Sequence, residues 1–133
     1  MRKINEIFIH CSATPAGREV TVEEMRRWHR ARGFRDVGYH YIIALDGTVL
    51  AGRPVAVAGA HCLGHNAHSI GICYVGGLDA DGHPADTRTT EQRTALRKIV
   101  RELMNRHHIA NVHGHNEFAQ KSCPCFDVRK EKF

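Results

Sequence analysis

The sequence has no long hydrophobic run, and none of its apolar stretches approaches the roughly 20 residues that a transmembrane helix requires. Residues 1–6 (MRKINE) make a basic start but contain no apolar core and no cleavage site of small residues, so a secretory signal is not expected. These absences predict a protein without membrane insertion that is cytoplasmic on synthesis. Any extracellular target would be reached by another route.

Cysteine is sparse, with five residues at scattered positions in a chain of 133. A secreted domain held together by disulfides uses an even number of cysteines at regular spacings, so such a framework is not expected here. Cys62 and Cys73 lie in or beside apolar stretches. They are predicted to be buried as small hydrophobic residues.

The chain has no block of lysine and arginine with interleaved aromatic residues, although its formal net charge is +5. Such blocks are typical of proteins that bind nucleic acids. The basic residues are instead spread over two predicted helices and the carboxyl-terminal tail, which favours a solvated basic face. Nucleic acid is therefore not expected as a partner, whereas a positive charge suits an anionic polymer.

Repeats, low-complexity segments and linkers are also absent, and 133 residues are enough to build one hydrophobic core. We therefore expect a single domain over residues 1–133, without a separate binding module. Strands are expected in apolar, β-branched runs and helices where apolar residues recur at helical spacing. The strands fall at residues 7–9, 37–45, 48–50, 69–75 and 109–112, and the helices at 21–33 and 89–107. This alternation predicts an α/β fold with a mixed β-sheet flanked by amphipathic helices.

Local signals sharpen this prediction. Residues 21–24 (TVEE) form a capping box at a helix start, and Asp46-Gly47 is a strong hairpin signal. The strand at 69–75 is almost wholly apolar and is expected at the centre of the sheet. Met25 and Trp28 follow helical spacing and are predicted to be core residues. Residues 51–66 are expected to be a loop with room for a short helix, and residues 76–86 a surface loop.

Histidine and cysteine gather at the ends of the first and last predicted strands. His10 ends the first strand, His113-Gly114-His115 follows the last, and Cys123-Pro124-Cys125 comes shortly after. Two imidazoles and a thiolate would hold zinc with its fourth position open, as in catalytic zinc sites. Spacing chooses neither between the two histidines nor between the two cysteines. The alternative is a set of buried, hydrogen-bonded histidines and unreactive thiols.

Five segments in sequence order carry a resemblance to a known family: IFIHCSAT (7–14), DVGYHYII (36–43), LDGTV (45–49), AGAHCLGHNAHSIGICYVGG (58–77) and GHNEFAQKSCPCFD (114–127). In these segments the chain resembles the type-2 N-acetylmuramoyl-L-alanine amidases, zinc enzymes that include small bacteriophage lysozymes and the peptidoglycan recognition proteins. The resemblance covers the chain nearly end to end. It implies a central mixed sheet flanked by helices.

The resemblance also implies roles for individual residues. His10, His115 and Cys123 fall on the positions that bind Zn²⁺, and Tyr39 and Lys121 fall on catalytic positions. A substrate-binding wall is expected from the segment that contains His61, Asn66, His68 and Ser69. The remaining histidines are expected to be structural or solvated: His29, His65, His83, His107 and His108.

The implied reaction is hydrolysis, by a zinc-activated water, of the amide between the lactyl group of N-acetylmuramic acid and L-alanine of the peptidoglycan stem peptide. We expect a monomeric phage or prophage endolysin. An interbacterial toxin or a muropeptide-recycling enzyme would have a similar sequence. The alternatives to an enzyme are a module that binds peptidoglycan without cutting it and a basic regulatory protein with a closed zinc site.

The sequence departs from the family at Cys125, where relatives commonly carry a small residue such as glycine or serine. A thiolate so close to Cys123 would compete for zinc or form an oxidised state. Neither is expected in a reducing cytosol.

Overall fold

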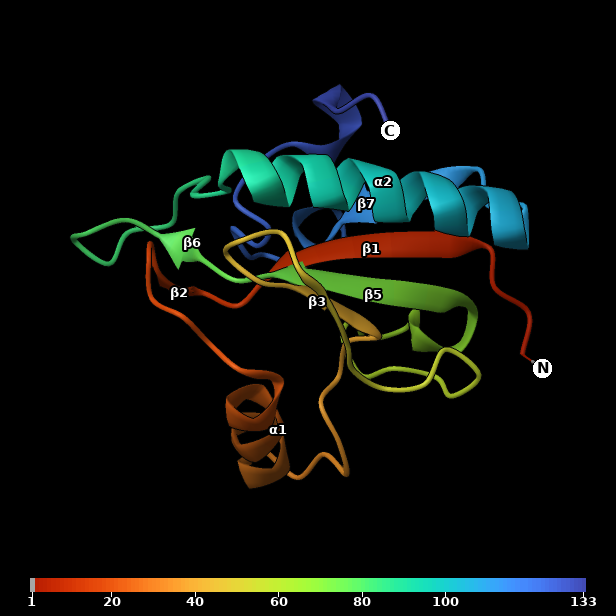
Figure 1. Ribbon diagram of the computed structural model, residues 1–133. Coiled ribbons are helices and arrows are strands. Elements are labelled where there is room, and N and C mark those ends of the chain that lie inside the picture. Colours follow the sequence, from red (N-terminus) through yellow and green to blue (C-terminus); the bar gives the residue numbers. More distant parts are fainter. Residues whose placement is uncertain (1) are drawn as a thin grey trace.

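The first predicted strand lies inside the main sheet. The structure is a computed structural model that describes residues 2–133, and over these residues the sheet has five strands in the order β4-β3-β5-β1-β7 (Figure 1). Their bounds are β1 (Glu6–Cys11), β3 (Tyr41–Ile43), β4 (Val49–Ala51), β5 (Ser69–Tyr74) and β7 (Asn111–Gly114). β1 is parallel to β5 and β7, while β3 and β4 form the antiparallel hairpin at Asp46-Gly47. The predicted mixed sheet is confirmed.

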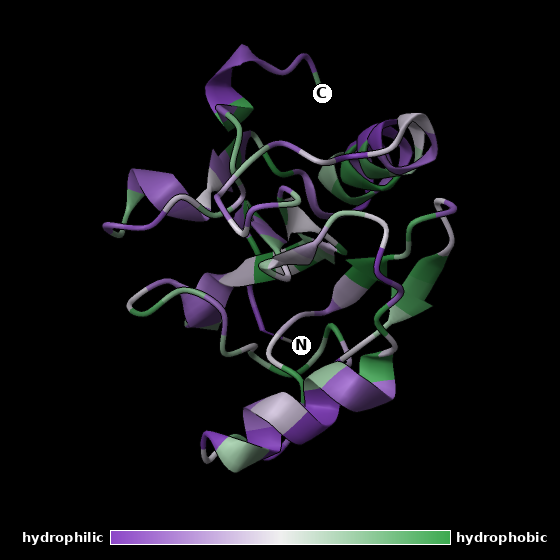
Figure 2. Cartoon of the chain, turned by 90° about the vertical axis from the view of Figure 1, so that its left-hand side faces the viewer, coloured by the Kyte–Doolittle hydropathy of each residue, from purple (hydrophilic) through white to green (hydrophobic). Residues whose placement is uncertain are grey.

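The centre of the sheet is buried on both faces. All six residues of β5 are buried, which confirms its predicted central place. Helix α2 (Thr90–His107) covers one face and α1 (Val22–Ala31) lies on the other side (Figures 1 and 2). Ile7 and Ile9 pack with Leu96 of α2. Because neighbouring strand residues point to opposite faces, His10 lies on the face away from α2.

Both helices begin at capping boxes that satisfy their first backbone amides. In α1 the Thr21 hydroxyl accepts from the Glu24 amide at 3.1 Å, and the Glu24 carboxylate accepts from the Thr21 amide at 3.3 Å. Thr89 and Gln92 form the same box in α2. The Gln92 side chain also donates to the carbonyl of Val75 at 2.9 Å. The start of α2 is therefore tied directly to the sheet.

Trp28 is not the core residue that its helical spacing suggested. Met25 is 1% exposed, whereas Trp28 is 38% exposed, with the guanidinium of Arg18 5.6 Å from its ring centroid. α1 buries only a narrow stripe that contains Met25 and His29, and Trp28 lies beside that stripe. The indole is therefore left at the edge of a cavity, described below.

This difference predicts unequal costs of truncation. Met25→Ala is expected to lower the free energy of unfolding by about 2–5 kcal/mol, because it leaves a hole in a packed core. Trp28→Ala is expected to lower it by only about 1 kcal/mol, as for a largely exposed residue. Urea denaturation of the two variants measures both values. A Trp28→Ala loss equal to that of Met25→Ala would contradict this assignment.

Several element boundaries also differ from prediction. The strand predicted at 37–45 is β3 alone, because the backbone at 38–40 bonds to three separate segments, namely residues 52–53, residue 60 and residue 71. The predicted surface loop 76–86 contains β6 (Gly77–Leu78), which pairs in parallel with β2 (Thr14–Pro15). β7 starts at Asn111 rather than at 109, because the Ile109 amide still bonds to Met104 of α2. Among the described residues, no helix is both long and apolar enough to cross a lipid bilayer.

Candidate metal centre and active-site cleft

The two ends of the sequence meet at the carboxyl ends of two adjacent parallel strands. β1 and β7 pair in register, with Ile9 opposite Gly114, so His10 and His115 each follow directly from this pair. The chain then leaves β7 through a short 3-10 turn, η2 (His115–Glu117), and returns past the same edge with Cys123. Side-chain groups at the carboxyl ends of parallel strands are well placed to form a site.

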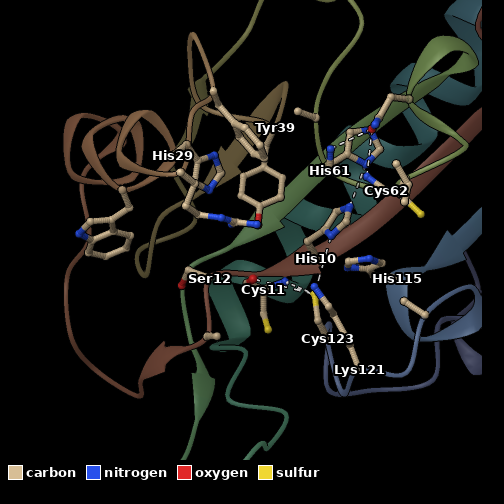
Figure 3. Close-up of a pocket in the computed structure, with 18 of the residues that line it drawn as sticks. His10, Cys11, Ser12, His29, Tyr39, His61, Cys62, His115, Lys121 and Cys123 are labelled. Atoms are coloured by element: carbon tan, nitrogen blue, oxygen red, sulfur yellow. Dashed lines mark hydrogen bonds between the residues drawn. The ribbon is translucent and has the colours of Figure 1, made fainter.

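His10, His115 and Cys123 bring one donor atom each within 4.8 Å of one another. The Cys123 Sγ lies 3.8 Å from Nδ1 of His10, and the His10 and His115 ring centroids are 4.7 Å apart. Figure 3 shows the three side chains converging at the floor of the cleft. Two imidazoles and a thiol, with no fourth protein donor in this group within residues 2–133, match the donor set of an open zinc site.

The side chains of His113 and Cys125 point away from these three donors. The His113 Nδ1 lies 3.2 Å from a Glu117 carboxylate oxygen, and its ring packs 5.2 Å from that of Phe8. The Cys125 Sγ lies 3.3 Å from the Gly77 carbonyl oxygen and 3.8 Å from the Cys11 Sγ. The choices that spacing left open therefore fall on His115 and Cys123, and Cys125 is turned away from the three donors.

The site keeps its imidazoles in the form that binds metal. Burial, and then the proximity of His61, His115 and Lys121, holds the pKa of His10 well below its usual value. The pKa of His115 is lowered by partial burial and then by Lys121. Both rings are thus neutral at pH 7, as a metal ligand must be. The Cys11 backbone amide donates to the Cys123 Sγ at 3.2 Å.

These donors open into a cavity of about 770 Å³. Its walls come from α1, the segment that follows it, the 60–66 loop and residues 115–123. Sequence reasoning missed several of the lining residues, among them Trp28, Arg32, Phe34, Leu63 and Phe118. Leu63, 96% exposed, offered one signal, because a leucine in a polar loop has no core to join.

Tyr39 and Lys121 both line this cavity. The half-buried Tyr39 ring lies 5.1 Å from the His10 ring, and burial raises the pKa of its phenol well above the usual value. Tyr39 is therefore a neutral hydrogen-bond donor. Lys121 is exposed on the opposite side of the centre and places a positive charge beside it.

The four residues of the predicted substrate wall separate into two groups. His61 and Asn66 line the cavity, and the Asn66 Oδ1 accepts from the backbone amides of His61 and Cys62 at 2.8 and 2.9 Å. Ser69 is fully buried behind His61, and the exposed His68 contacts the carbonyl of Lys3 at 3.0 Å. Neither Ser69 nor His68 is part of the cavity lining within the described residues.

Other histidines and cysteines lie where the sequence predicted. Cys62 and Cys73 are 2% and 0% exposed. His29 is buried, and its Nδ1 accepts from the Gly38 amide at 2.8 Å, so it has a structural bond even though it borders the cavity. His83 is a solvated loop residue.

An α/β domain with a three-donor His/His/Cys centre at the floor of an open cleft has the architecture of a metal-dependent hydrolase. The comparison with known proteins identifies which hydrolase. The chain belongs to the N-acetylmuramoyl-L-alanine amidase family, whose sequence profile matches residues 1–126. It is an amidase that hydrolyses the bond between N-acetylmuramic acid and L-alanine.

Similar proteins include phage endolysins and a bacterial amidase. The endolysin of Klebsiella phage KP32 is 45% identical over 129 residues, which cover 97% of this chain and 85% of that protein. The endolysin of Escherichia phage T7 is 44% identical over 124 residues, covering 93% and 82%. Among solved structures, the N-acetylmuramoyl-L-alanine amidase LysC from Clostridium intestinale URNW superposes with a TM-score of 0.80 at 30% identity, covering 92% of this chain and 77% of that one.

Proposed function

We propose that this chain is a phage-type endolysin whose amidase activity depends on zinc held by His10, His115 and Cys123. The observation that carries this proposal is the convergence of those three donors, from both ends of the sequence, at the floor of an open cleft. The likeness to phage endolysins over nearly the whole chain supports the biological role.

Zinc bound there would supply Lewis acidity, which acidifies water and polarises a carbonyl group. The protein supplies the rest of the site. The Lys121 ammonium stabilises the oxyanion that develops on the scissile carbonyl, an effect worth about 3–4 kcal/mol for a single donor in comparable sites. Tyr39 donates a hydrogen bond to the reacting oxygen, since its phenol stays protonated.

The cleft walls bind the two sides of the scissile amide. We assign the side of this wall that faces the substrate to His61 and Asn66, which border the cavity. His68 and Ser69 belong to the same segment and shape it from outside the cavity. The exposed Trp28, Leu63 and Phe118 add apolar surface at the walls, suited to sugar rings and alanine methyl groups.

The domain is proposed to act as a monomer on peptidoglycan or soluble muropeptides. We propose that it is synthesised in the cytoplasm and acts on the cell wall. Its net charge of +5 would favour association with an anionic wall. Sedimentation at micromolar concentration tests the monomer directly.

Mass spectrometry of defined muropeptides after digestion tests the proposed function. The expected products are a free muramic lactyl carboxylate and a stem peptide with a free L-alanine amine. Cleavage at a glycosidic bond, or within the stem peptide, would contradict the proposal. Binding of peptidoglycan without any new end would identify a recognition module instead.

A further inference from the structure

A line of hydrogen bonds, formed by His10, His61 and Ser69, leads from the metal centre away from the cleft. The His10 Nε2 lies 2.9 Å from the His61 Nδ1, and the His61 Nε2 lies 3.1 Å from the Ser69 Oγ (Figure 3 shows the first two rings). The Ser69 hydroxyl in turn donates to the His65 carbonyl at 2.7 Å. His10, His61 and Ser69 are 1%, 8% and 0% exposed.

The end of this line fixes the direction of every bond in it. A carbonyl oxygen only accepts, so the Ser69 hydroxyl proton is committed to His65 and its oxygen accepts from Nε2–H of His61. A neutral imidazole that carries its proton on Nε2 has a lone pair on Nδ1, so the His61 Nδ1 accepts. The donor to that nitrogen is Nε2–H of His10. The His10 Nδ1 therefore carries a lone pair, and this is the nitrogen that faces Cys123.

The surroundings of the His61 ring are built to its shape. A Cβ on Gly71, in the central strand β5, would lie 2.6 Å from the ring carbons of His61, and a Cβ on Gly59 would lie 2.8 Å from its Cδ2. Gly71 has ordinary strand backbone, and the three atoms nearest to a Cβ there all belong to the His61 ring. Asn66 holds the His61 backbone amide from the loop side. Packing and hydrogen bonding thus specify the same ring position.

We propose that His61 is a positioning residue of the metal centre: it holds His10 as the Nε2–H tautomer, oriented so that Nδ1 faces the metal, with Ser69 setting the tautomer of His61. This inference rests on the proposed zinc function of His10, His115 and Cys123. A metal-binding histidine is oriented, and made more basic, by the partner of its other ring nitrogen. Loss of such a partner typically costs about 10–100-fold in metal affinity or activity.

Zinc affinity, measured by competition with a chromogenic chelator, tests the proposal independently of catalysis. His61→Leu is expected to weaken zinc binding by about 10–100-fold. His61→Asn is expected to retain most of the affinity, because its Oδ1 accepts a hydrogen bond from the place of Nδ1. His68→Leu is the matched control, since His68 is exposed and outside the line; its zinc affinity should equal that of the wild type.

Gly71→Ala provides a second test that removes no polar atom. Its methyl group is expected to displace the His61 ring and weaken zinc binding, whereas in a His61→Ala background the same substitution should have no further effect. This non-additivity is the signature of two residues that act through one contact. Additive losses would contradict the proposed route through the ring.

Nitrogen-15 NMR of the His10 ring reads the tautomer directly in metal-free protein. One tautomer, protonated at Nε2, is expected in the wild type and in His61→Asn, and a mixture in His61→Leu. If His61→Leu does not fold, the wild type and His61→Asn still decide the matter, because an Nδ1–H tautomer in either would overturn the proposal.

The outcomes separate this inference from the function on which it rests. A wild-type protein that binds no zinc would refute the zinc function itself. One equivalent of zinc in the wild type, with unchanged affinity in His61→Leu, would refute only the positioning role. A raised KM for muropeptide at unchanged zinc affinity would make His61 a substrate-binding residue alone.

Discussion

Cys123→Ala is expected to reduce peptidoglycan cleavage to background and to remove stoichiometric zinc binding. The substitution deletes one of the three converging donors, and the remaining two histidines leave the metal held too weakly to persist in dilute enzyme. Muropeptide release and zinc content after gel filtration measure the two effects. Removal of zinc from the wild type by a chelator should give the same loss, restored on adding zinc.

Cys125→Ala is the matched control, because it removes a thiol two residues away that faces Gly77 and Cys11. Activity and zinc content near the wild-type level are expected. Normal cleavage by Cys123→Ala would refute the assignment of that ligand. Loss of zinc in Cys125→Ala, with Cys123 intact, would move the metal to the other thiol.

Lys121→Met is expected to lower kcat by roughly 10²–10³-fold while leaving zinc binding intact, in line with the loss of one oxyanion donor. The methionine keeps most of the side-chain length and removes the charge. Because Lys121 is exposed, its replacement should not unfold the domain. Steady-state kinetics on a soluble muropeptide separates kcat from KM.

Lys121→Arg, which retains the positive charge, should recover part of the rate. An unchanged kcat in Lys121→Met would exclude the proposed role at the oxyanion. A rise in KM alone would place the ammonium on the substrate rather than at the reacting carbonyl.

The sequence predicts the sheet, both helices and the meeting of the chain ends. The apolar run at 69–75 is long enough to require a central strand, and the capping residues at 21–24 mark one helix start unambiguously. Sequence spacing does not decide whether His113 or His115 is the metal ligand. That choice depends on a turn after Gly114, which sends the two side chains in different directions. Spacing along an extended strand would have placed them on one face.

The exposure of Trp28 and the hydrogen bonds that join His10, His61 and Ser69 could not be predicted from the sequence. Helical spacing states which residues share a face, but not how wide a stripe the neighbouring sheet covers, and α1 is covered only around Met25 and His29. The partner of His61 is 51 positions away in the sequence, and the pairing depends on a glycine in β5 that leaves room for a ring. No local pattern encodes such a contact.

Lytic activity can arise only after β1 and β7 have paired in the sheet. His10 and Cys123 are separated by 113 positions in the sequence. Nearly the whole chain must therefore be synthesised and folded before the two donors lie side by side. Such distant pairings form late and are slow to assemble. A partly synthesised or partly unfolded chain therefore cannot hold the metal and cannot hydrolyse peptidoglycan.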